Sequence, residues 1–591
     1  MKAALAWLES RTGAARLARE YLYAGIPGGA RWRYAWGGVL LFALAVQFVT
    51  GFFLWLDYSP SAQTAWESVY YIQNQMTGGS ILRGLHHYGA QLLPVLLALH
   101  LFQLVIGGAY KSPREVNFWV SLLLLQLVLV TALTGYQLPW DQKGFWATKV
   151  AVNLLGIVPL IGSSLQRMLI GGPDYGHLTL TRFFALHAGL LPALMALVVG
   201  AQMYLRRRHG FAGDASGRRP DAPYWPDQAL RNAVVCFAFV LTLLFLSLSH
   251  RSENGVELGA PADPSAPYAA ARPEWYFLFL YQFLKLFRGS SEIWGAIIIP
   301  GLVMLVIFLM PFIARWRKIG HSLNVAFLCA ILAGAGILFA LAKSSDAHDP
   351  DYQAALKDAE AQAARVKLLA QTRGIPTDGA LALLQNDPLT QGPKLFAQNC
   401  ASCHRYHGTD GLGHTVKDPQ SASDLAGFAS REWLAGLLDP QKISTTNYFG
   451  GTKFAAGKMS RFVKKEIANL TDEDKAKLQQ TIAALSAQAQ LPSQQAVDQR
   501  DADAITKGRG YLVDDLDCVK CHKFGSESGE SAPDLTGYGS REWLQRFLKN
   551  PGHSDFYDTD NDRMPAFGEK KMLSAAQIAV ISDWLRGDWV Q

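Results

Sequence analysis

Two short stretches near the C-terminus carry residues that can bind an iron porphyrin. Each reads Cys-x-x-Cys-His, at 400–404 and at 518–522. Two cysteines within one turn can form thioethers with the vinyl groups of a heme, and the adjacent histidine can ligate the iron. We therefore predict two covalent c-type hemes held by Cys400, Cys403 and His404 and by Cys518, Cys521 and His522. The alternatives are a zinc ribbon or a pair of disulfides.

Each of these hemes needs a second axial ligand. Met459 and Met564 lie where small cytochromes c supply a methionine, and Met564, which precedes a proline, is the better match. His407 and His414 compete with Met459 for this role. Ligation by histidine and methionine raises the reduction potential, which favours acceptance of electrons.

The two motifs belong to an internal repeat. Asp424-Leu425 and the Ser-Arg-Glu-Trp-Leu stretch at 430–434 are answered by Asp534-Leu535 and the same five residues at 540–544. A repeat of this kind predicts a duplicated domain. The predicted small helical cytochrome c domains are 392–490 and 500–591.

The 591 residues exceed what one hydrophobic core can hold, and the chain changes character near residue 342. Long apolar runs dominate before this point, and an ordinary soluble composition follows it. The sequence thus predicts an all-α fold, a seven-span transmembrane helical bundle followed by the two cytochrome c domains. Runs of about 20 residues, enough to cross a bilayer, occur at 36–57, 88–108, 116–138, 183–204, 229–249, 293–313 and 322–342.

The formal net charge is +7, and the basic residues cluster in loops instead of forming one stripe, so no nucleic-acid signature is present. Loops rich in Lys and Arg are expected to be cytoplasmic. The loops 58–80, 139–182 and 250–292, and everything after 342, then face the compartment where covalent hemes are attached. We predict a multi-pass protein of the bacterial inner membrane with its c-type domains on the periplasmic side. The basic set is Arg31, Arg33, Lys111, Arg114, Arg206 to Arg208, Arg218, Arg219, Arg315, Arg317 and Lys318.

Segments that flank the spans have simpler predictions. Residues 1–29 lack a cleavable signal peptide and suit an amphipathic helix on the membrane surface. After the last span, 343–391 is predicted to hold a stalk helix over 349–372 and a turn-rich linker from 374. Cys236 and Cys329, alone in apolar segments, are predicted to be buried small hydrophobic residues.

Three histidines lie in or beside apolar runs, where ionisable side chains are costly and often functional. His86 and His100 are 14 residues apart, so one helix would place them about 40° apart in azimuth and about 21 Å apart along its axis. One helix can thus ligate two stacked hemes. His187 enters its helix from the same side as His86, so these two residues can clamp one heme. The alternative is that each histidine only hydrogen-bonds inside the bundle.

The apolar part resembles cytochrome b of the quinol-oxidising cytochrome bc and bf complexes. It is most similar to a four-helix cytochrome b joined to a three-helix subunit IV, here at 30–210 and 211–342. The matching stretches are Arg83 with His86 and His100, Gly135 to Gln142, Leu180 to Phe183 leading to His187, Pro226-Asp227, and Pro273 to Tyr276.

This resemblance implies two b hemes. His86 and His187 would ligate the heme near the outer face and His100 the inner heme, and Arg83 and Arg182 would contact the cofactor. The second inner ligand would fall at Gln202, where the family has histidine. The inner heme would then be five-coordinate, be ligated by Met203, or be absent. We predict two b hemes per two c hemes, with a spectrally unusual inner heme.

The resemblance also implies a quinol site at the outer face. Glu274 would accept a proton from the quinol hydroxyl, because a carboxylate in a poorly hydrated loop suits general-base chemistry. Tyr276 and Tyr136 join Glu274 as predicted catalytic residues. The predicted quinol-binding residues are Pro139, Trp140, Pro273 and Trp275.

The implied partners are a separate Rieske iron-sulfur protein, a soluble cytochrome c or terminal oxidase, and a membrane quinone, in a dimeric multi-subunit complex. The predicted function is a quinol:cytochrome c oxidoreductase that releases protons at the outer face. Two alternatives stay open. One is a quinone reductase that feeds electrons from the c hemes into the quinone pool, and the other is a membrane-anchored electron carrier without its own quinone site.

Overall fold

The computed structural model describes residues 2–210, 220–249, 256–316, 319–527, 529, 531–561 and 563–591. The regular secondary structure of the described chain is helical, apart from one antiparallel pair of strands and a few isolated bridges. The strands are β1 (Gly25–Ile26) and β2 (Ala222–Pro223). It forms two compact units, Met1–Leu381 and Ala382–Gln591. The predicted all-α class is confirmed.

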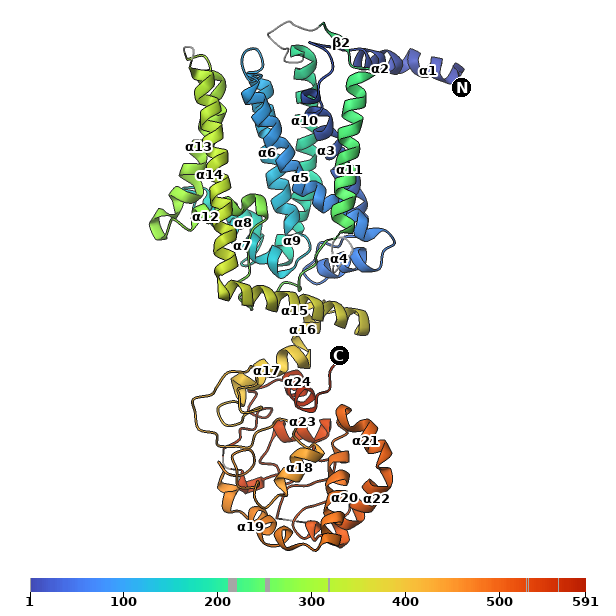
Figure 1. Ribbon diagram of the computed structural model, residues 1–591, viewed down its shortest axis with the longest axis vertical. Helices are drawn as coiled ribbons and strands as arrows, with labels where there is room; N and C mark the ends of the chain where they lie inside the picture. Colours follow the sequence, from blue (N-terminus) through green and yellow to red (C-terminus); the bar gives the residue numbers. More distant parts are fainter. Residues whose placement is uncertain are drawn as a thin grey trace. The chain divides into compact units, whose positions relative to one another are not determined.

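Seven helical segments of the first unit are long and apolar enough to cross a membrane, among the residues that the structure describes (Figure 1). They confirm the seven predicted spans. Four spans are single helices: α5 (Gly79–Ile106), α6 (Glu115–Tyr136), α11 (Asp227–Leu248) and α14 (Gly320–His348). The span Trp32–Asp57 consists of η1 (Trp32–Tyr34) and α3 (Trp36–Asp57), and the span His177–His209 consists of α9 (His177–Phe184), the π-helical η2 (Ala185–Leu190) and α10 (Leu191–His209). The span Gly289–Ile313 consists of η4 (Gly289–Ser291), the π-helical η5 (Trp294–Ile298) and α13 (Ile299–Ile313).

The helices α3, α5, α6, α10 and α11 pack around one apolar core that includes Leu93, Leu97 and Phe239. Small residues let these helices approach closely, as is usual in membranes. A Cβ on Gly84 of α5 would lie 2.4 Å from the Oγ of Ser247 on α11. The opposite faces of these helices carry exposed apolar side chains, as expected for contact with lipid.

One end of the bundle carries the basic loops. Here α1 (Lys2–Thr12) and α2 (Ala14–Leu22) replace the single predicted surface helix, because the chain turns at Gly13, whose φ is +61°. An ion pair of 2.7 Å between Glu20 and Arg207 connects α2 to α10. Four members of the predicted basic set lie outside the described residues: Arg218, Arg219, Arg317 and Lys318.

The other end, which we call the loop end, carries short helices in its long connections. These are α4 (Ala65–Asn74), α7 (Gln142–Gly156), α8 (Gly162–Ile170), η3 (Trp275–Phe277) and α12 (Leu278–Leu284). The predicted stalk helix is α15 (Pro350–Arg373), which starts directly after α14 and runs across the loop end in Figure 1. The carboxylate of Asp349 accepts hydrogen bonds from the backbone N–H groups of Asp351 and Tyr352, which explains this start.

One burial prediction is wrong. Cys236 on α11 is half-buried, but Cys329 on α14 is exposed. The reason is that α14 packs along only part of its surface, so most of its apolar side chains face outward where lipid would be. An apolar run in a membrane protein therefore does not indicate which of its residues are buried in protein.

The second unit holds both Cys-x-x-Cys-His motifs. Its N-terminal helix α17 packs on the last helix α24, and α20 packs on α22. The predicted boundaries at 392–490 and 500–591 stay predictions, and the predicted linker contains α16 and the start of α17. The helices are α16 (Leu381–Gln385), α17 (Pro388–Asn399), α18 (Arg431–Leu437), η6 (Lys453–Ala456), α19 (Lys458–Lys465), η7 (Ile467–Asn469), α20 (Asp472–Gln488), η8 (Pro492–Gln494), α21 (Gln495–Arg500), α22 (Ala502–Asp514), η9 (Cys518–Lys520), α23 (Arg541–Lys549), η10 (Asp558–Asp560) and α24 (Ala575–Arg586).

Asp141 connects two segments at the loop end. Its carboxylate accepts hydrogen bonds from the backbone N–H of Gly144, at 2.8 Å, and of Gly259, at 3.2 Å. The first bond caps α7, and the second holds the 256–262 segment, whose Ala260 carbonyl accepts a bond from the N–H of Gln142. Burial raises the pKa of the Asp141 carboxyl group.

We expect Asp141→Ala to destabilise the first unit by about 2–4 kcal/mol, because it removes a helix cap and leaves the partly buried N–H of Gly259 without this acceptor. The measurement is the free energy of unfolding of the purified protein in detergent. Asp141→Asn, which keeps one acceptor oxygen, should recover at least half of the loss. Equal losses in the two variants would show that the hydrogen bonds do not matter.

Candidate heme and quinol sites

The structure brings His86 and His187 together from two different spans. His86 lies on α5, and His187 lies in the π-helical turn η2 that precedes α10. Their ring centroids are 6.2 Å apart, with the ring planes at 77°. An iron between two imidazoles requires a separation of about 6 Å, since each metal–nitrogen bond is about 2 Å and each ring centre lies about 1 Å further away. The two side chains therefore fit a heme iron between them.

The hydrogen bonds of these two rings leave the same atom available on each. The Nδ1 of His86 lies 2.9 Å from the Oγ1 of Thr50, and the Nδ1 of His187 lies 2.9 Å from the carbonyl oxygen of Thr131. With Nδ1 occupied, Nε2 remains as the ligand atom, and such bonds orient a metal-binding imidazole. The roles of Thr50 and Thr131 as hydrogen-bond partners of the two rings could not be predicted from the sequence, because nothing in the spacing of these threonines distinguishes them from packing residues.

A glycine lies against each ring. A Cβ on Gly51 of α3 would come within 3.0 Å of the His86 ring, and a Cβ on Gly135 of α6 would come within 2.5 Å of the His187 ring. A larger residue at either position would push an imidazole out of line. The close approach of a histidine ring therefore explains why glycine occupies both positions.

We call the layer of the bundle around His86 and His187 the first level, and the layer around His100, 14 residues further along α5, the second level. The residues of the second level differ from those of the first. His100 lies on α5, but its Nδ1 is buried without a hydrogen-bond partner among the described residues. Gln202 donates from its Nε2 to the Oγ of Ser121, at 3.0 Å, while its Oε1 is buried and has no hydrogen-bond partner in the described part of the chain. Met203, the predicted substitute ligand, is 41% exposed, and the Nδ1 of His209 lies 2.7 Å from the side-chain oxygen of Asn117.

Ser121 is a residue that sequence analysis missed although a signal was present. It precedes Gly135 by 14 residues on α6, just as Gly37 precedes Gly51 on α3 and His86 precedes His100 on α5. The second level thus has serine at the position where the first level has a glycine beside its histidine. Its only predicted histidine ligand is His100.

The predicted quinol-site residues gather at the loop end. Glu274 precedes η3, and its Oε2 accepts a hydrogen bond of 2.7 Å from the Nε2 of Gln91 on α5. The hydroxyl of Tyr136 donates to the carbonyl of Arg272, at 3.3 Å. Burial, followed by the charge of Glu274, raises the pKa of Tyr276. Gln91 was not predicted, because its partner is 183 residues away in the sequence.

An ion pair fixes the segment that carries Glu274. Arg272 donates to Asp346 of α14 from Nε, at 3.0 Å, and from Nη2, at 2.9 Å. These side chains are only 13% and 10% exposed, and the guanidinium also lies 4.1 Å from the ring centroid of Tyr352. Burial is the largest effect and lowers the pKa of Arg272, but the hydrogen bond to Asp346 together with the charges of Tyr281, Asp346 and Tyr352 outweighs it, and the net shift is upward.

The remaining predicted quinol residues flank this segment. Trp140 is 4% exposed and has a φ of +50°, a strained conformation for a residue with a side chain. Its carbonyl accepts a bond from the N–H of Ala262, which fixes this turn. Pro139 and Pro273 are half-buried, while Trp275 is 43% exposed and makes an edge contact with Phe339 of α14.

The two predicted cofactor arginines bind backbone carbonyls. Arg83 donates to Val256, at 2.8 Å, and to Glu257, at 3.1 Å. Arg182 donates to Met168 near the C-terminus of α8. Both residues thus hold loop-end segments, and their contact with a heme stays a prediction.

Each Cys-x-x-Cys-His motif forms one compact turn that suits heme attachment. The N–H of His404 donates to the carbonyl of Cys400, at 2.8 Å, and the N–H of His522 donates to that of Cys518, at 3.0 Å. The Nδ1 of His404 lies 2.8 Å from the carbonyl of Ser423, and the Nδ1 of His522 lies at the same distance from that of Pro533. Nε2 is again left for the iron in both cases.

The surroundings of these motifs are apolar. Burial raises the pKa of the Cys400 thiol to about 12 and that of the Cys518 thiol to about 11. Burial also lowers the pKa of both His404 and His522, which favours the neutral imidazole that binds iron. No two of the six cysteines, all of which lie among the described residues, form a disulfide in the structure, which leaves the disulfide alternative without support.

The candidate methionines are both half-buried in apolar clusters, Met459 at the start of α19 and Met564 in the loop before α24. The competing His414 is a solvent-facing residue, since its side chain is 75% exposed and its Nδ1 pairs with Asp410 at 3.0 Å. The backbone N–H of His407 donates to Asp424.

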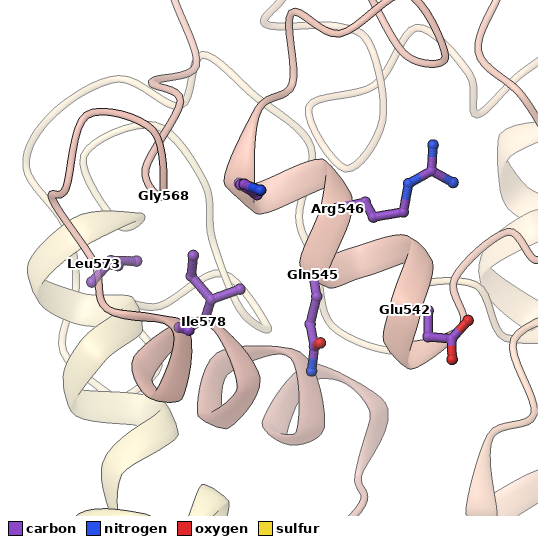
Figure 2. Close-up of a pocket in the computed structure, with 8 residues that line it drawn as sticks. Glu542, Gln545, Arg546, Gly568, Leu573 and Ile578 are labelled. Atoms are coloured by element: carbon purple, nitrogen blue, oxygen red, sulfur yellow. The ribbon is translucent and has the colours of Figure 1, made fainter.

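A surface pocket of about 480 Å³ lies elsewhere in the second unit. Figure 2 shows its apolar side at Leu573 and Ile578, with Gln545 and Glu542 projecting from α23 and Arg546 pointing away. None of the predicted ligands lines it. The lining residues are Glu542, Gln545, Arg546, Lys549, Gly568, Leu573, Ala575 and Ile578.

Comparison with known proteins agrees with this division. The family model for cytochrome b/b6/petB matches residues 25–210, that for cytochrome b (C-terminal)/b6/petD matches 261–353, and that for cytochrome c matches 389–483. A chain of the solved hyperthermophilic respiratory complex III superposes with a TM-score of 0.50 at 26% identity, over 61% of this chain and 95% of that chain.

Curated relatives lead to the same family. Cytochrome b of Cereibacter sphaeroides is 35% identical over 49% of this chain, which spans 66% of that protein. The menaquinol:cytochrome c reductase cytochrome b subunit of Bacillus subtilis (strain 168) is 43% identical over 30% of this chain and 81% of that protein. The chain therefore belongs to the cytochrome b family, with a cytochrome c domain fused after its membrane spans.

Proposed function

We propose that this chain is the fused cytochrome b and cytochrome c subunit of a membrane quinol:cytochrome c oxidoreductase. The names of its relatives support this class, since one of them is a menaquinol:cytochrome c reductase subunit and another chain belongs to a respiratory complex III. The fused c domain gives the same polypeptide both an entry for electrons and an exit.

The hydrogen bond between Gln91 and Glu274 is the observation that carries the proposal. Gln91 follows His86 by five residues on α5, which corresponds to about 8 Å along the helix axis. The carboxylate of Glu274 is therefore held about one and a half helical turns from His86 along α5. A proton acceptor close to an electron-acceptor site is what quinol oxidation requires.

In this proposal Glu274 accepts a proton from the quinol hydroxyl, and Gln91 orients the receiving carboxylate. Tyr136 and Tyr276 flank this carboxylate, and Pro139, Trp140, Pro273 and Trp275 bound the pocket. The Arg272–Asp346 ion pair positions the backbone that precedes Glu274. Bound heme supplies a one-electron acceptor between His86 and His187, and a proton on Glu274 leaves toward the outer compartment.

We propose two b hemes, the outer one between His86 and His187 and the inner one on His100 alone. The buried Nδ1 of His100 and Oε1 of Gln202, which have no hydrogen-bond partner among the described residues, support a group bound at the second level. Two covalent c hemes complete the set of cofactors, at the Cys400 and Cys518 motifs.

The proposed partners come from the resemblance to the cytochrome b family, and the proposed location comes from the charges of the loops. One electron of each quinol passes to a separate Rieske iron-sulfur protein, and the c hemes deliver electrons to a soluble cytochrome c or an oxidase. We place the chain in the bacterial inner membrane as part of a dimeric complex, with the basic loops on the cytoplasmic side and the c domain on the periplasmic side.

We expect Glu274→Gln to slow quinol-dependent reduction of the c hemes by about 10²-fold or more, which is the usual contribution of a general base. Stopped-flow absorbance of the c hemes in membranes measures this rate. Glu292→Gln, at an exposed glutamate of the next segment, is the control and should keep the wild-type rate. Wild-type rates in Glu274→Gln would contradict the assigned base, and quinone reduction by reduced c hemes without any quinol oxidation would contradict the direction of the reaction.

We expect the wild-type protein to contain two b hemes and two c hemes, with one b heme high-spin because it has a single histidine ligand. The double variant Ser121→Gly/Gln202→His should convert this heme to the low-spin form, because it supplies both the ligand and the room that Gly135 gives to His187. A pyridine hemochrome ratio and an electron paramagnetic resonance spectrum measure the two quantities. The variant Ser121→Gly alone should remain high-spin, and a wild-type ratio of one b heme to two c hemes would disprove the inner site.

A further inference from the structure

The helix that precedes the first Cys-x-x-Cys-His motif packs against the last helix of the chain. Phe396 of α17 lies 5.3 Å from Trp584 of α24 between ring centroids, and Tyr406 lies 4.3 Å from the same indole. A Cβ on Gly392 of α17 would lie 2.3 Å from the side chain of Trp584, so glycine is required at this crossing. The first motif thus contacts the C-terminal end of the second stretch.

The helix that precedes the second motif packs in the complementary way. A Cβ on Gly508 of α22 would lie 2.0 Å from the carbonyl oxygen of Gln480 on α20, and the hydroxyl of Thr481 donates to the carbonyl of Gly508, at 3.4 Å. Lys477 of α20 pairs with Asp515, just after α22, at 2.9 Å. Neither α17 with α20 nor α22 with α24 makes a comparable contact in the described part of the chain.

The apolar clusters divide in the same way. One contains Cys400 and Phe396 together with Phe567, and Met564 packs against it. The other contains Leu478 and Leu485 of α20 together with Leu512 and Leu516 beside the second motif, and both Met459 and Cys518 pack against it.

We propose that the two c-heme sites are assembled by exchange between the two repeats. Met564 is the axial partner of His404, and Met459 is the axial partner of His522. The two ligands of the His522 site then lie in one continuous stretch, in the order Met459, α20, α22 and motif. The two ligands of the His404 site lie in the segments that flank this stretch.

The sequence of the repeats permits this exchange. Each helix that precedes a motif has a glycine where another helix crosses it, Gly392 in α17 and Gly508 in α22. Each can therefore pack against the C-terminal helix of either repeat. The connection between α20 and α22 is short and includes α21, which makes their pairing a local helical hairpin. Local contacts form at a lower entropic cost than distant ones.

A buried arginine, Arg586, and a partly buried one, Arg431, bind the connection between α20 and α22. Arg586 of α24 is 8% exposed and donates to the carbonyls of Gly539, at 3.0 Å, and Gln490, at 3.1 Å. Arg431 of α18 pairs with Asp498 and Asp501 in the connection between α20 and α22, at 2.6 and 2.5 Å. These bonds fix the connection in the path that the exchange requires.

Carbodiimide cross-linking of the wild-type, heme-loaded protein tests the exchange without any substitution. The reagent joins a carboxylate directly to an amine, so we expect a Lys477–Asp515 cross-link in tryptic peptides. Lys477→Arg should abolish it. A protein that cross-links elsewhere but never at this pair would overturn the exchange.

The ligand pairing is tested by substitutions in proteins that retain a single c heme. In Cys400→Ala/Cys403→Ala, adding Met459→Ala should abolish the sulfur-to-iron charge-transfer band and lower the midpoint potential of the remaining c heme. Adding Met564→Ala should leave both unchanged. In Cys518→Ala/Cys521→Ala the two methionines should exchange roles. Met572→Ala, at a methionine that is 51% exposed, is the control.

The reverse dependence, with Met459 serving His404 and Met564 serving His522, would overturn the proposal. The pairing depends on covalent heme attachment but not on quinol oxidation. A wild-type protein without covalent heme would therefore contradict the proposed cofactors, whereas slow quinol oxidation with the expected bands would contradict only the proposed function.

Discussion

The separation of His86 and His187 is the constraint on which the proposed outer heme site depends. An iron accepts two imidazoles only at a fixed separation, so in this proposal α5 and the turn before α10 must be held at the observed 6.2 Å between ring centroids. Glycines on α3 and α6 leave room behind the rings, and Thr50 and Thr131 orient them. Four helices thus contribute to one ligand pair, which explains why they pack into a single core.

The second level of the bundle shows how a buried polar substitution is accommodated. An amide in an apolar interior costs free energy unless it is hydrogen-bonded. Gln202 meets half of this requirement by donating to Ser121, while its oxygen has no hydrogen-bond partner among the residues that the structure describes. The glutamine and the serine therefore belong together. The hydroxyl of Ser121 accepts the bond from Gln202 and fills the space that a histidine ring would need. The two levels thus differ at this pair: the first level has Gly135 and His187, and the second has Ser121 and Gln202.

The sequence predicted the spans well because they depend on a local pattern, while the heme-ligand roles of the histidines stay predictions. Hydropathy defines a span, and a helix fixes the relation between His86 and His100. The bond between Gln91 and Glu274 could not be predicted, since neither residue type is distinctive and the two are far apart in the chain. Likewise, hydropathy did not show that Cys329 faces outward, because lipid and protein are equally apolar surroundings.

The repeat in the second unit illustrates a stronger limit. Two copies with the same pattern contain the same signals for helix packing, so the sequence indicates which helices exist but not which copy each one joins. The structure resolves this ambiguity through Trp584, which packs on α17 instead of α22. Once the helices are exchanged, neither copy has a complete core of its own. The two stretches must then fold as one cooperative body, which agrees with their forming a single compact unit from Ala382 to Gln591.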